Sequence, residues 1–157
     1  MKISKKLREN NSLNYKKFNV NMTEFVNDNN IKSPTNYLLI TSLEEKFTYV
    51  YEKKNNVWEM LYKYSSTVGK PSTPTIKGVF AVGQKYEAIG TENSSARYAT
   101  NITGEYYYHS ILYDPKNLYI KDDRLGVAIS HGCIRLATSS AKWIYDNVPE
   151  GSTIVIH

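Results

Sequence analysis

Short runs of apolar, aromatic and β-branched residues dominate the chain from residue 37 onward. They are rich in Tyr, Val, Ile, Leu and Thr, and turn residues separate them. Such runs are typical of antiparallel strands. We predict strands over residues 37–41, 46–51, 57–65, 79–82, 106–112 and 153–156, with a hairpin turn over residues 53–56. Residues 69–74, which include two prolines, break the pattern and do not suit a central strand.

One segment has helical spacing instead. Ala141, Ile144, Tyr145 and Val148 recur at the period of an amphipathic helix, and Pro149 and Gly151 end the pattern. Thr138 or Ser139 is the expected N-cap. Many short strands and one good helix predict a mainly β domain.

The first 36 residues differ in character. They are rich in Asn and Lys, and their apolar residues keep neither a strand nor a helix period. We interpret residues 1–35 as a linker or the stump of an upstream region, and residues 36–157 as the folded domain. Ser33-Pro34 marks the boundary. Within this region Thr23 is the expected cap of a short helix through Asn27.

Charge follows the same division. The 157 residues carry a net charge of +5, with 41% hydrophobic and 22% charged residues. Residues 1–36 account for +4 of this charge, so the rest of the chain is nearly neutral. A nucleic-acid-binding protein needs Lys and Arg clustered on its binding face, and the chain after residue 36 supplies no such cluster. Nucleic acid is therefore excluded as the expected partner. The sequence shows neither an apolar run of roughly 18 residues nor a signal-peptide core, which fits a cytosolic protein or a piece of a longer exported one.

The chemically informative stretch is Ser130-His131-Gly132-Cys133-Ile134-Arg135-Leu136, which holds the single cysteine. A thiol reacts as its thiolate and needs a nearby base or positive charge, and His131 and Arg135 are each two residues away. Gly132 permits a backbone turn that aims consecutive N–H groups at an oxyanion. A lone cysteine is more often a buried apolar residue, but these neighbours favour a nucleophile. Zinc is not expected, because no second pair of ligands has suitable spacing.

This stretch resembles the active-site signature of the L,D-transpeptidase catalytic domain family (YkuD type). The resemblance covers about the last 120 residues. It includes the Gly-Lys-Pro-Ser-Thr-Pro-Thr-Ile-Lys-Gly-Val-Phe segment of residues 69–80, Tyr107-Tyr108-His109-Ser110, Leu125-Gly126, and the closing helix with residues 151–156. It implies a mainly β, mixed, sandwich-like fold with one C-terminal helix.

The resemblance also implies roles for individual residues. Cys133 is the nucleophile and His109, 24 positions upstream, its base. The backbone carbonyl of Ser110 holds the imidazole, so the Ser110 side chain is expected to tolerate change. His131 shapes the site, although its closeness to Cys133 makes it the second candidate for the base. Gly132 and Arg135 are expected to bind substrate, Arg135 through a carboxylate; a structural salt bridge to an acid such as Asp122 or Asp123 is the alternative.

The implied activity is peptidoglycan L,D-transpeptidation. Cys133 attacks a tetrapeptide stem after its third residue, releases the terminal D-Ala, and passes the acyl group to a neighbouring stem as a 3→3 crosslink, without cofactor or metal. Stem peptides are the expected partners and carbapenem β-lactams the expected covalent inhibitors. The expected location is extracytoplasmic, at the cell wall or surface, with the export signal in a region upstream of this chain. An L,D-carboxypeptidase that uses water as acceptor, and a non-catalytic wall-binding module, stay open.

Overall fold

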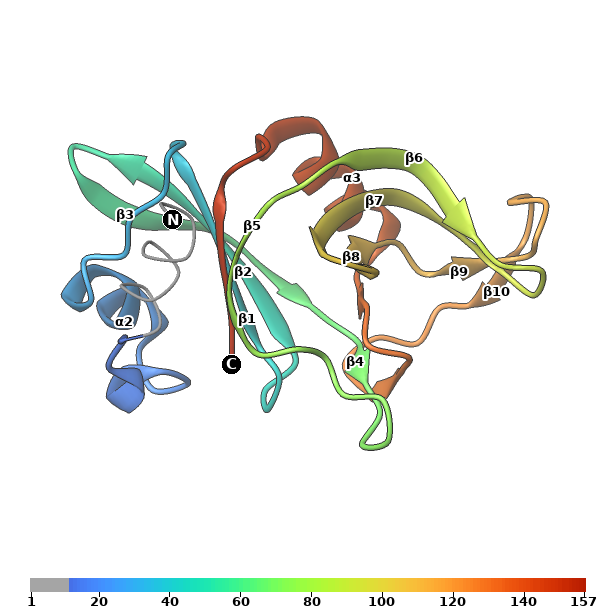
Figure 1. Cartoon of the computed structure of the whole chain (residues 1–157), viewed down its shortest axis with the longest axis horizontal. Helices are drawn as coiled ribbons and strands as arrows, with labels where there is room; N and C mark the ends of the chain where they lie inside the picture. The colour runs from blue at the N-terminus through green and yellow to red at the C-terminus, as the bar shows by residue number, and fades with distance from the viewer. Residues whose placement is uncertain (1–11) are drawn as a thin grey trace.

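Two β-sheets pack face to face in the computed structural model, which describes residues 12–157 (Figure 1). The first sheet has the order β3-β2-β1-β13-β5. Its strands are β1 (Tyr37–Ser42), β2 (Phe47–Lys54), β3 (Val57–Ser65), β5 (Gly78–Ala81) and β13 (Thr153–Ile156). β1 pairs with β13 in parallel, whereas the other pairs are antiparallel. The last strand therefore lies inside the sheet, between β1 and β5.

The second sheet has the order β10-β9-β7-β8-β12, and β6 pairs with β7 at its side. β4 and β11 form a small parallel pair of their own. These strands are β4 (Val68–Gly69), β6 (Lys85–Gly90), β7 (Ser95–Thr103), β8 (Tyr106–His109), β9 (Leu112–Tyr113), β10 (Ile120–Asp122), β11 (Ala128–Ser130) and β12 (Ile134–Arg135). Parallel and antiparallel pairs occur in both large sheets, so the prediction of a mainly β, mixed, sandwich-like fold is confirmed.

The C-terminal helix α3 (Thr138–Asn147) begins where the sequence predicts, but not with the predicted cap. Its N-cap is Ala137, which makes no side-chain capping bond. The Thr138 hydroxyl instead lies 2.7 Å from the Tyr113 hydroxyl, and this contact ties the helix to β9. Ala141, Ile144 and Val148 face the core between the sheets, as their spacing predicts.

The central strands β1 and β13 of the first sheet are buried on both faces. Leu39 of β1, with Ile154 and Ile156 of β13, packs into the core shared with the second sheet and α3. Leu38 and Ile40 face the other way, into a second apolar cluster. The material that covers this second face comes from the N-terminal segment.

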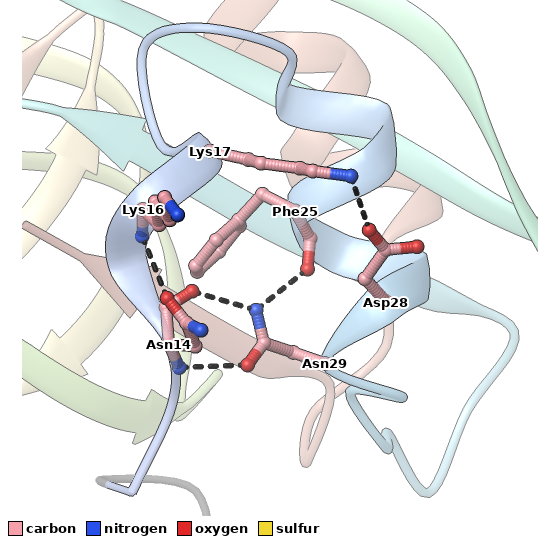
Figure 2. A pocket seen from close by; sticks show the side chains of 6 residues that line it. All are labelled: Asn14, Lys16, Lys17, Phe25, Asp28 and Asn29. Atoms are coloured by element: carbon pink, nitrogen blue, oxygen red, sulfur yellow. Dashed lines mark hydrogen bonds and ion pairs between the residues drawn. The ribbon is translucent and has the colours of Figure 1, made fainter.

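Residues 12–31 form that cover, with a 3₁₀ turn η1 (Tyr15–Lys17) and helix α2 (Met22–Asp28) lying against the sheet (Figure 1). The segment buries five apolar side chains almost completely: Phe18, Met22, Phe25, Val26 and Ile31. Figure 2 shows how Asn14 and Asn29 join the two elements. The Asn14 N–H donates to Asn29 Oδ1 at 2.7 Å, and Asn29 Nδ2 donates to the Asn14 carbonyl at 2.9 Å.

The interpretation of residues 1–35 as a linker or stump therefore does not describe residues 12–31, which pack as part of the fold. Residues 1–11, to which it also applied, lie outside the described residues. The predicted helix over residues 23–27 is present as α2, but Asn21 rather than Thr23 caps it, since the Asn21 side chain accepts the Glu24 N–H at 3.0 Å. Within residues 12–157, no helix is long and apolar enough to cross a membrane.

Candidate active site

Strands β8 and β12 bring the upstream histidine and the cysteine together. The two strands pair in parallel, with Ile134 opposite Tyr108 and Arg135 opposite His109. Tyr108 and Ile134 are fully buried in the core. Because side chains alternate along a strand, Cys133 and His109 point to the opposite face of the sheet. Residues 24 positions apart thus share one face.

That face forms the floor of a cleft of about 560 Å³. His109, Cys133 and Arg135 line it from below, together with Tyr107. Its walls come from the hairpin between β6 and β7, from Asp122 of β10, and from His131. All the site residues that the sequence singles out are therefore at or next to this cleft.

His109 is held in one tautomer. The residue is 6% exposed, and Nδ1 lies 2.7 Å from the Ser110 carbonyl oxygen. A carbonyl only accepts, so Nδ1 carries the proton and Nε2 keeps a free lone pair. Burial lowers the pKa of His109 to about 4; the Ser110 carbonyl opposes this shift and the charge of Arg135 adds to it. At neutral pH the imidazole is uncharged and able to accept a proton.

Cys133 is partly exposed, and its Sγ lies 3.5 Å from the Glu105 carbonyl oxygen, to which the S–H donates. Burial raises the pKa of the Cys133 thiol, the Tyr107 backbone N–H lowers it, and the charge of Glu105 raises it. The resting pair is therefore a thiol and a neutral imidazole rather than an ion pair. A nucleophile of this kind is activated by transfer of its proton to the base during attack.

The loop before Cys133 requires glycine at one position. Gly132 has φ +123°, and a Cβ there would lie 2.7 Å from Tyr106 Cε1. The Ser130 hydroxyl closes the loop, since it donates to the Cys133 carbonyl at 2.6 Å and accepts the Gly132 N–H at 3.1 Å. The sequence led us to expect that consecutive backbone N–H groups of this loop point at an oxyanion, and one of these groups is already bonded. The Gly132 N–H is used inside the loop, and the Cys133 N–H is left as the candidate oxyanion donor.

The glycine- and proline-rich segment after β4 supports the same loop from behind. The Thr73 hydroxyl donates to the Ser130 carbonyl at 2.8 Å, and the Lys70 N–H donates to it at 3.0 Å. The segment folds back so tightly that a Cβ on Gly69 would lie 2.1 Å from the Thr73 carbonyl oxygen. Neither Ser130 nor Thr73 was assigned a role from the sequence, although both lie in the motifs that carry the resemblance.

The Ser110 side chain is not free, contrary to the expectation that it tolerates change. It is fully buried, its hydroxyl donates to the Ile111 carbonyl at 2.7 Å, and it accepts the Arg97 N–H at 2.7 Å. These bonds tie the end of β8 to β7 next to His109. Ser110 therefore holds the imidazole through its backbone and holds that backbone through its side chain.

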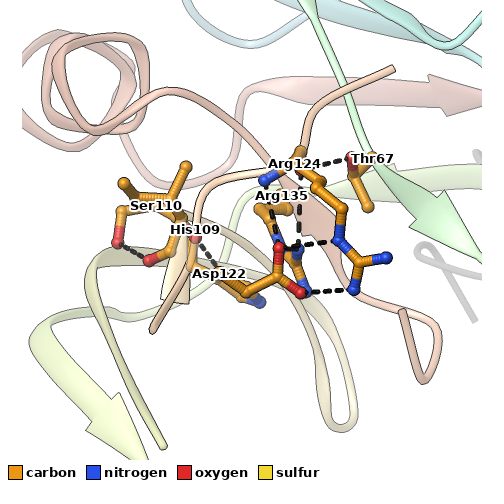
Figure 3. Close-up of polar contacts among 7 residues, drawn as sticks. Thr67, His109, Ser110, Asp122, Arg124 and Arg135 are labelled. Atoms are coloured by element: carbon orange, nitrogen blue, oxygen red, sulfur yellow. Dashed lines mark hydrogen bonds and ion pairs between the residues drawn. The ribbon is translucent and has the colours of Figure 1, made fainter. Parts of the chain in front are cut away.

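Arg135 makes the salt bridge that was the alternative to substrate binding. Its Nη1 lies 3.3 Å from Asp122 Oδ1, and the residue is only 4% exposed (Figure 3). Asp122 also pairs with Arg124. His131, in contrast, is exposed and lines the cleft. Within residues 12–157, no three His, Cys, Asp or Glu residues gather as a metal site would require.

A protein-family model matches most of the chain. The model of the L,D-transpeptidase catalytic domain (YkuD) matches residues 36–156. The chain belongs to this family. L,D-transpeptidases of the YkuD family are cysteine-dependent acyltransferases that act on peptidoglycan.

Individual L,D-transpeptidases and related structures are similar over most of the chain. The Bacillus subtilis (strain 168) protein YciB, named as an L,D-transpeptidase, is 30% identical in an alignment of 122 residues that covers 73% of this chain and 62% of YciB. The crystal structure of a Clostridium acetobutylicum fused Zn-dependent amidase/peptidase/peptidoglycan-binding domain-containing protein is 40% identical, with a TM-score of 0.67. The similarity covers 81% of this chain and 55% of the Clostridium acetobutylicum chain.

The L,D-transpeptidase LdtMt1 in complex with imipenem is 27% identical, with a TM-score of 0.62, over 78% of this chain and 59% of that one. The chain thus spans between about half and two thirds of the length of these relatives.

Proposed function

We propose that this L,D-transpeptidase domain forms 3→3 peptidoglycan crosslinks through a thioester on Cys133, with His109 as the base. The observation that carries the proposal is the state of His109: a buried, neutral imidazole whose Nδ1 donates to the Ser110 carbonyl, on the same face as Cys133. Such an imidazole accepts a proton from one group and returns it to another, which two-step acyl transfer requires.

In the first step His109 Nε2 takes the Cys133 proton as the sulfur attacks the carbonyl of the third stem residue. The Cys133 N–H is the donor nearest the resulting oxyanion. The C–N bond then breaks, and the departing amine of the terminal D-Ala takes the proton from His109. A thioester and free D-Ala are the products.

In the second step the amine of a neighbouring stem attacks the thioester and gives its proton to His109. Collapse releases the sulfur, which recovers that proton, and the new amide is the 3→3 crosslink. Protons and electron pairs balance without a cofactor. Since the substrate is peptidoglycan, we place the working enzyme outside the cytoplasm, at the cell wall.

The nearest alternative uses the same first step with water as acceptor, which makes the domain an L,D-carboxypeptidase. The second alternative is a non-catalytic wall-binding module, whose basic N-terminal residues bind an anionic polymer. One observation weighs against the module: Lys17 is already paired with Glu24 and Asp28, at 3.2 and 2.7 Å. A second is that Gly132, Ser130 and Thr73 maintain a tightly packed, hydrogen-bonded loop at Cys133, which an idle site does not need.

The test is to incubate the full chain with tetrapeptide muropeptides and to identify the products by mass. We expect crosslinked dimers with loss of one D-Ala, and none with the Cys133→Ala variant. Tripeptide monomers alone would assign the carboxypeptidase activity. Unchanged substrate with a folded protein would favour the binding module.

A further inference from the structure

Arg135 is buried with its hydrogen-bonding capacity only partly used. Nη1 lies 3.3 Å from Asp122 Oδ1 and 3.5 Å from the Arg124 carbonyl, both long for charge-assisted bonds. Nε is buried and has no hydrogen-bond partner anywhere in residues 12–157. A guanidinium binds a carboxylate best through two parallel N–H bonds, and the contact with Asp122 uses only one. The buried cation of the cleft is therefore incompletely paired.

Asp122 has a second and better partner. Arg124 donates from Nε to Oδ1 at 3.0 Å and from Nη2 to Oδ2 at 2.7 Å, which is the two-bond arrangement that Arg135 lacks (Figure 3). The Arg124 side chain is 63% exposed, so its guanidinium has room to follow Asp122, while the Arg124 backbone carbonyl accepts the Thr67 hydroxyl at 2.9 Å. If Asp122 leaves Arg135, its charge stays compensated.

The strand that carries Asp122 is short. β10 has three residues and, within the described part of the chain, pairs with β9 alone, with an irregular register between Ile120 and Asp122. Asp122 and Arg135 line the cleft together with His109 and Cys133, and Arg135 lies opposite His109 across the β8–β12 pair. An anion bound to Arg135 would thus lie beside the proposed base.

We propose that Asp122 is an internal carboxylate that the terminal carboxylate of the acyl donor displaces from Arg135, with Asp122 moving onto Arg124 alone. The identity of the donor rests on the proposed function. His109 returns its proton to the amine of the departing residue, so the carboxylate of that same residue is the one that comes closest to Arg135. Arg135 then gains a two-bond partner and its Nε a hydrogen bond. Asp122 is a specificity-determining residue, since a donor without this carboxylate does not compete with it.

The experiment follows the Nε–H resonance of Arg135 by NMR in the full chain labelled with ¹⁵N, and Arg135→Lys identifies the resonance. The probes are N-acetyl-D-alanine and N-acetyl-D-alaninamide, which differ only in the carboxylate. We expect the acid to shift the resonance with saturation and the amide to leave it in place. Because the titration needs no turnover, it has an outcome whether or not the muropeptide assay detects crosslinks.

Three variants separate exchange from a purely structural ion pair. Asp122→Asn removes the competitor, so the acid should half-saturate at a concentration at least about threefold lower. Arg124→Gln removes the second partner of Asp122, so half-saturation should require about threefold more acid. Asp123→Asn makes the same change of charge at the adjacent exposed residue and should have no effect. Thermal melting checks that each variant is folded.

A resonance that the acid does not move, or one that the amide moves as far as the acid does, would overturn the assignment to the terminal carboxylate. Weaker binding in folded Asp122→Asn would show that Asp122 holds Arg135 in place rather than competing for it. If the Arg124→Gln variant binds the acid as tightly as the wild type does, Arg124 is not the residue that takes over Asp122, and the proposed exchange is wrong.

Discussion

At the scale of single residues, the site works through protonation states that the surroundings impose. Burial keeps His109 neutral, with the Ser110 carbonyl opposing the shift, while burial raises the pKa of Cys133. Both effects leave the proton on sulfur until substrate arrives. Acylation should therefore depend on His109 as an acceptor rather than on a standing thiolate.

This state predicts the acid limit of activity. The pKa of His109 is lowered from 6.5 to about 4, so the base is lost only as the pH falls through about 4. Acylation by imipenem, followed by intact mass at a series of pH values, should keep its rate from about pH 8 to about pH 5 and fall below that. Circular dichroism at each pH checks the fold. A fall centred near 6.5 would show that His109 titrates as an exposed imidazole does.

The two histidines of the cleft should differ in effect. Replacing His109 with Gln removes the proton acceptor, so acylation should slow by about 10²–10⁴-fold. His131→Gln, at an exposed residue of the same cleft, should change the rate much less. Stopped-flow quenching of intrinsic fluorescence on mixing with imipenem measures both. The reverse order of damage would transfer the role of base to His131.

Residue-scale features were predictable where a local motif carries them. The grouping of Cys133 with His109 follows from the resemblance, and the contact with the Ser110 carbonyl is present as it implies. The pairing of Arg135 with Asp122 was one of two open alternatives, because sequence order does not reveal which acid β10 brings over the cleft. The Ser110 side chain was misjudged, since its partner Arg97 lies on a strand that the sequence pattern did not predict.

At the scale of elements, the predicted strands over residues 37–65 and 153–156 are present with small shifts at their ends. β6 and β7 were missed. β7 does not alternate, and Tyr98 in its middle has φ +53°, which interrupts the pleat. The predicted strand over residues 106–112 is divided into β8 and β9, because the chain turns at Ser110 where the Ser110 N–H bonds the Arg97 carbonyl.

The loop before Cys133 gives a prediction at this scale. Gly132→Ala places a methyl group 2.7 Å from the Tyr106 ring at φ +123°, so the loop must shift and acylation should fall by at least about tenfold. Gly104→Ala is the matched control, because Gly104 also has positive φ, +51°, but has no atom within 4 Å of the added Cβ. Gly104→Ala should acylate normally. Equal loss in both variants would point to backbone strain in general rather than to the site loop.

At the scale of the whole molecule, the first sheet depends on the N-terminal segment. The family model begins at residue 36, but Phe18, Phe25 and Ile31 lie almost fully buried against the sheet. We propose that residues 36–157 carry the catalytic chemistry and that residues 12–35 complete the same folding unit. The sequence pattern did not reveal this, because a short helix and a turn that cover a sheet show no sustained period of their own.

Phe25→Ala tests the cover directly. Phe25 is fully buried and stacks on Tyr15, so its truncation should lower the free energy of unfolding by about 3–5 kcal/mol. Val20→Ala, on the same segment but 80% exposed, should change it by less than about 0.5 kcal/mol. Urea unfolding followed by fluorescence measures both. Equal stability of the two variants would show that the segment adds little to the fold.

The central claim is that Cys133 becomes acylated, and intact mass after exposure to imipenem tests it most directly. A carbapenem presents a strained lactam carbonyl to the same thiol and base as a stem peptide, and the ring-opened amine stays tethered, so the thioester should persist. We predict that the wild-type protein gains the mass of one imipenem molecule, that peptide mapping places it on Cys133, and that Cys133→Ala gains nothing. A wild-type protein that stays unmodified, or a Cys133→Ala protein that is modified equally, would contradict the account.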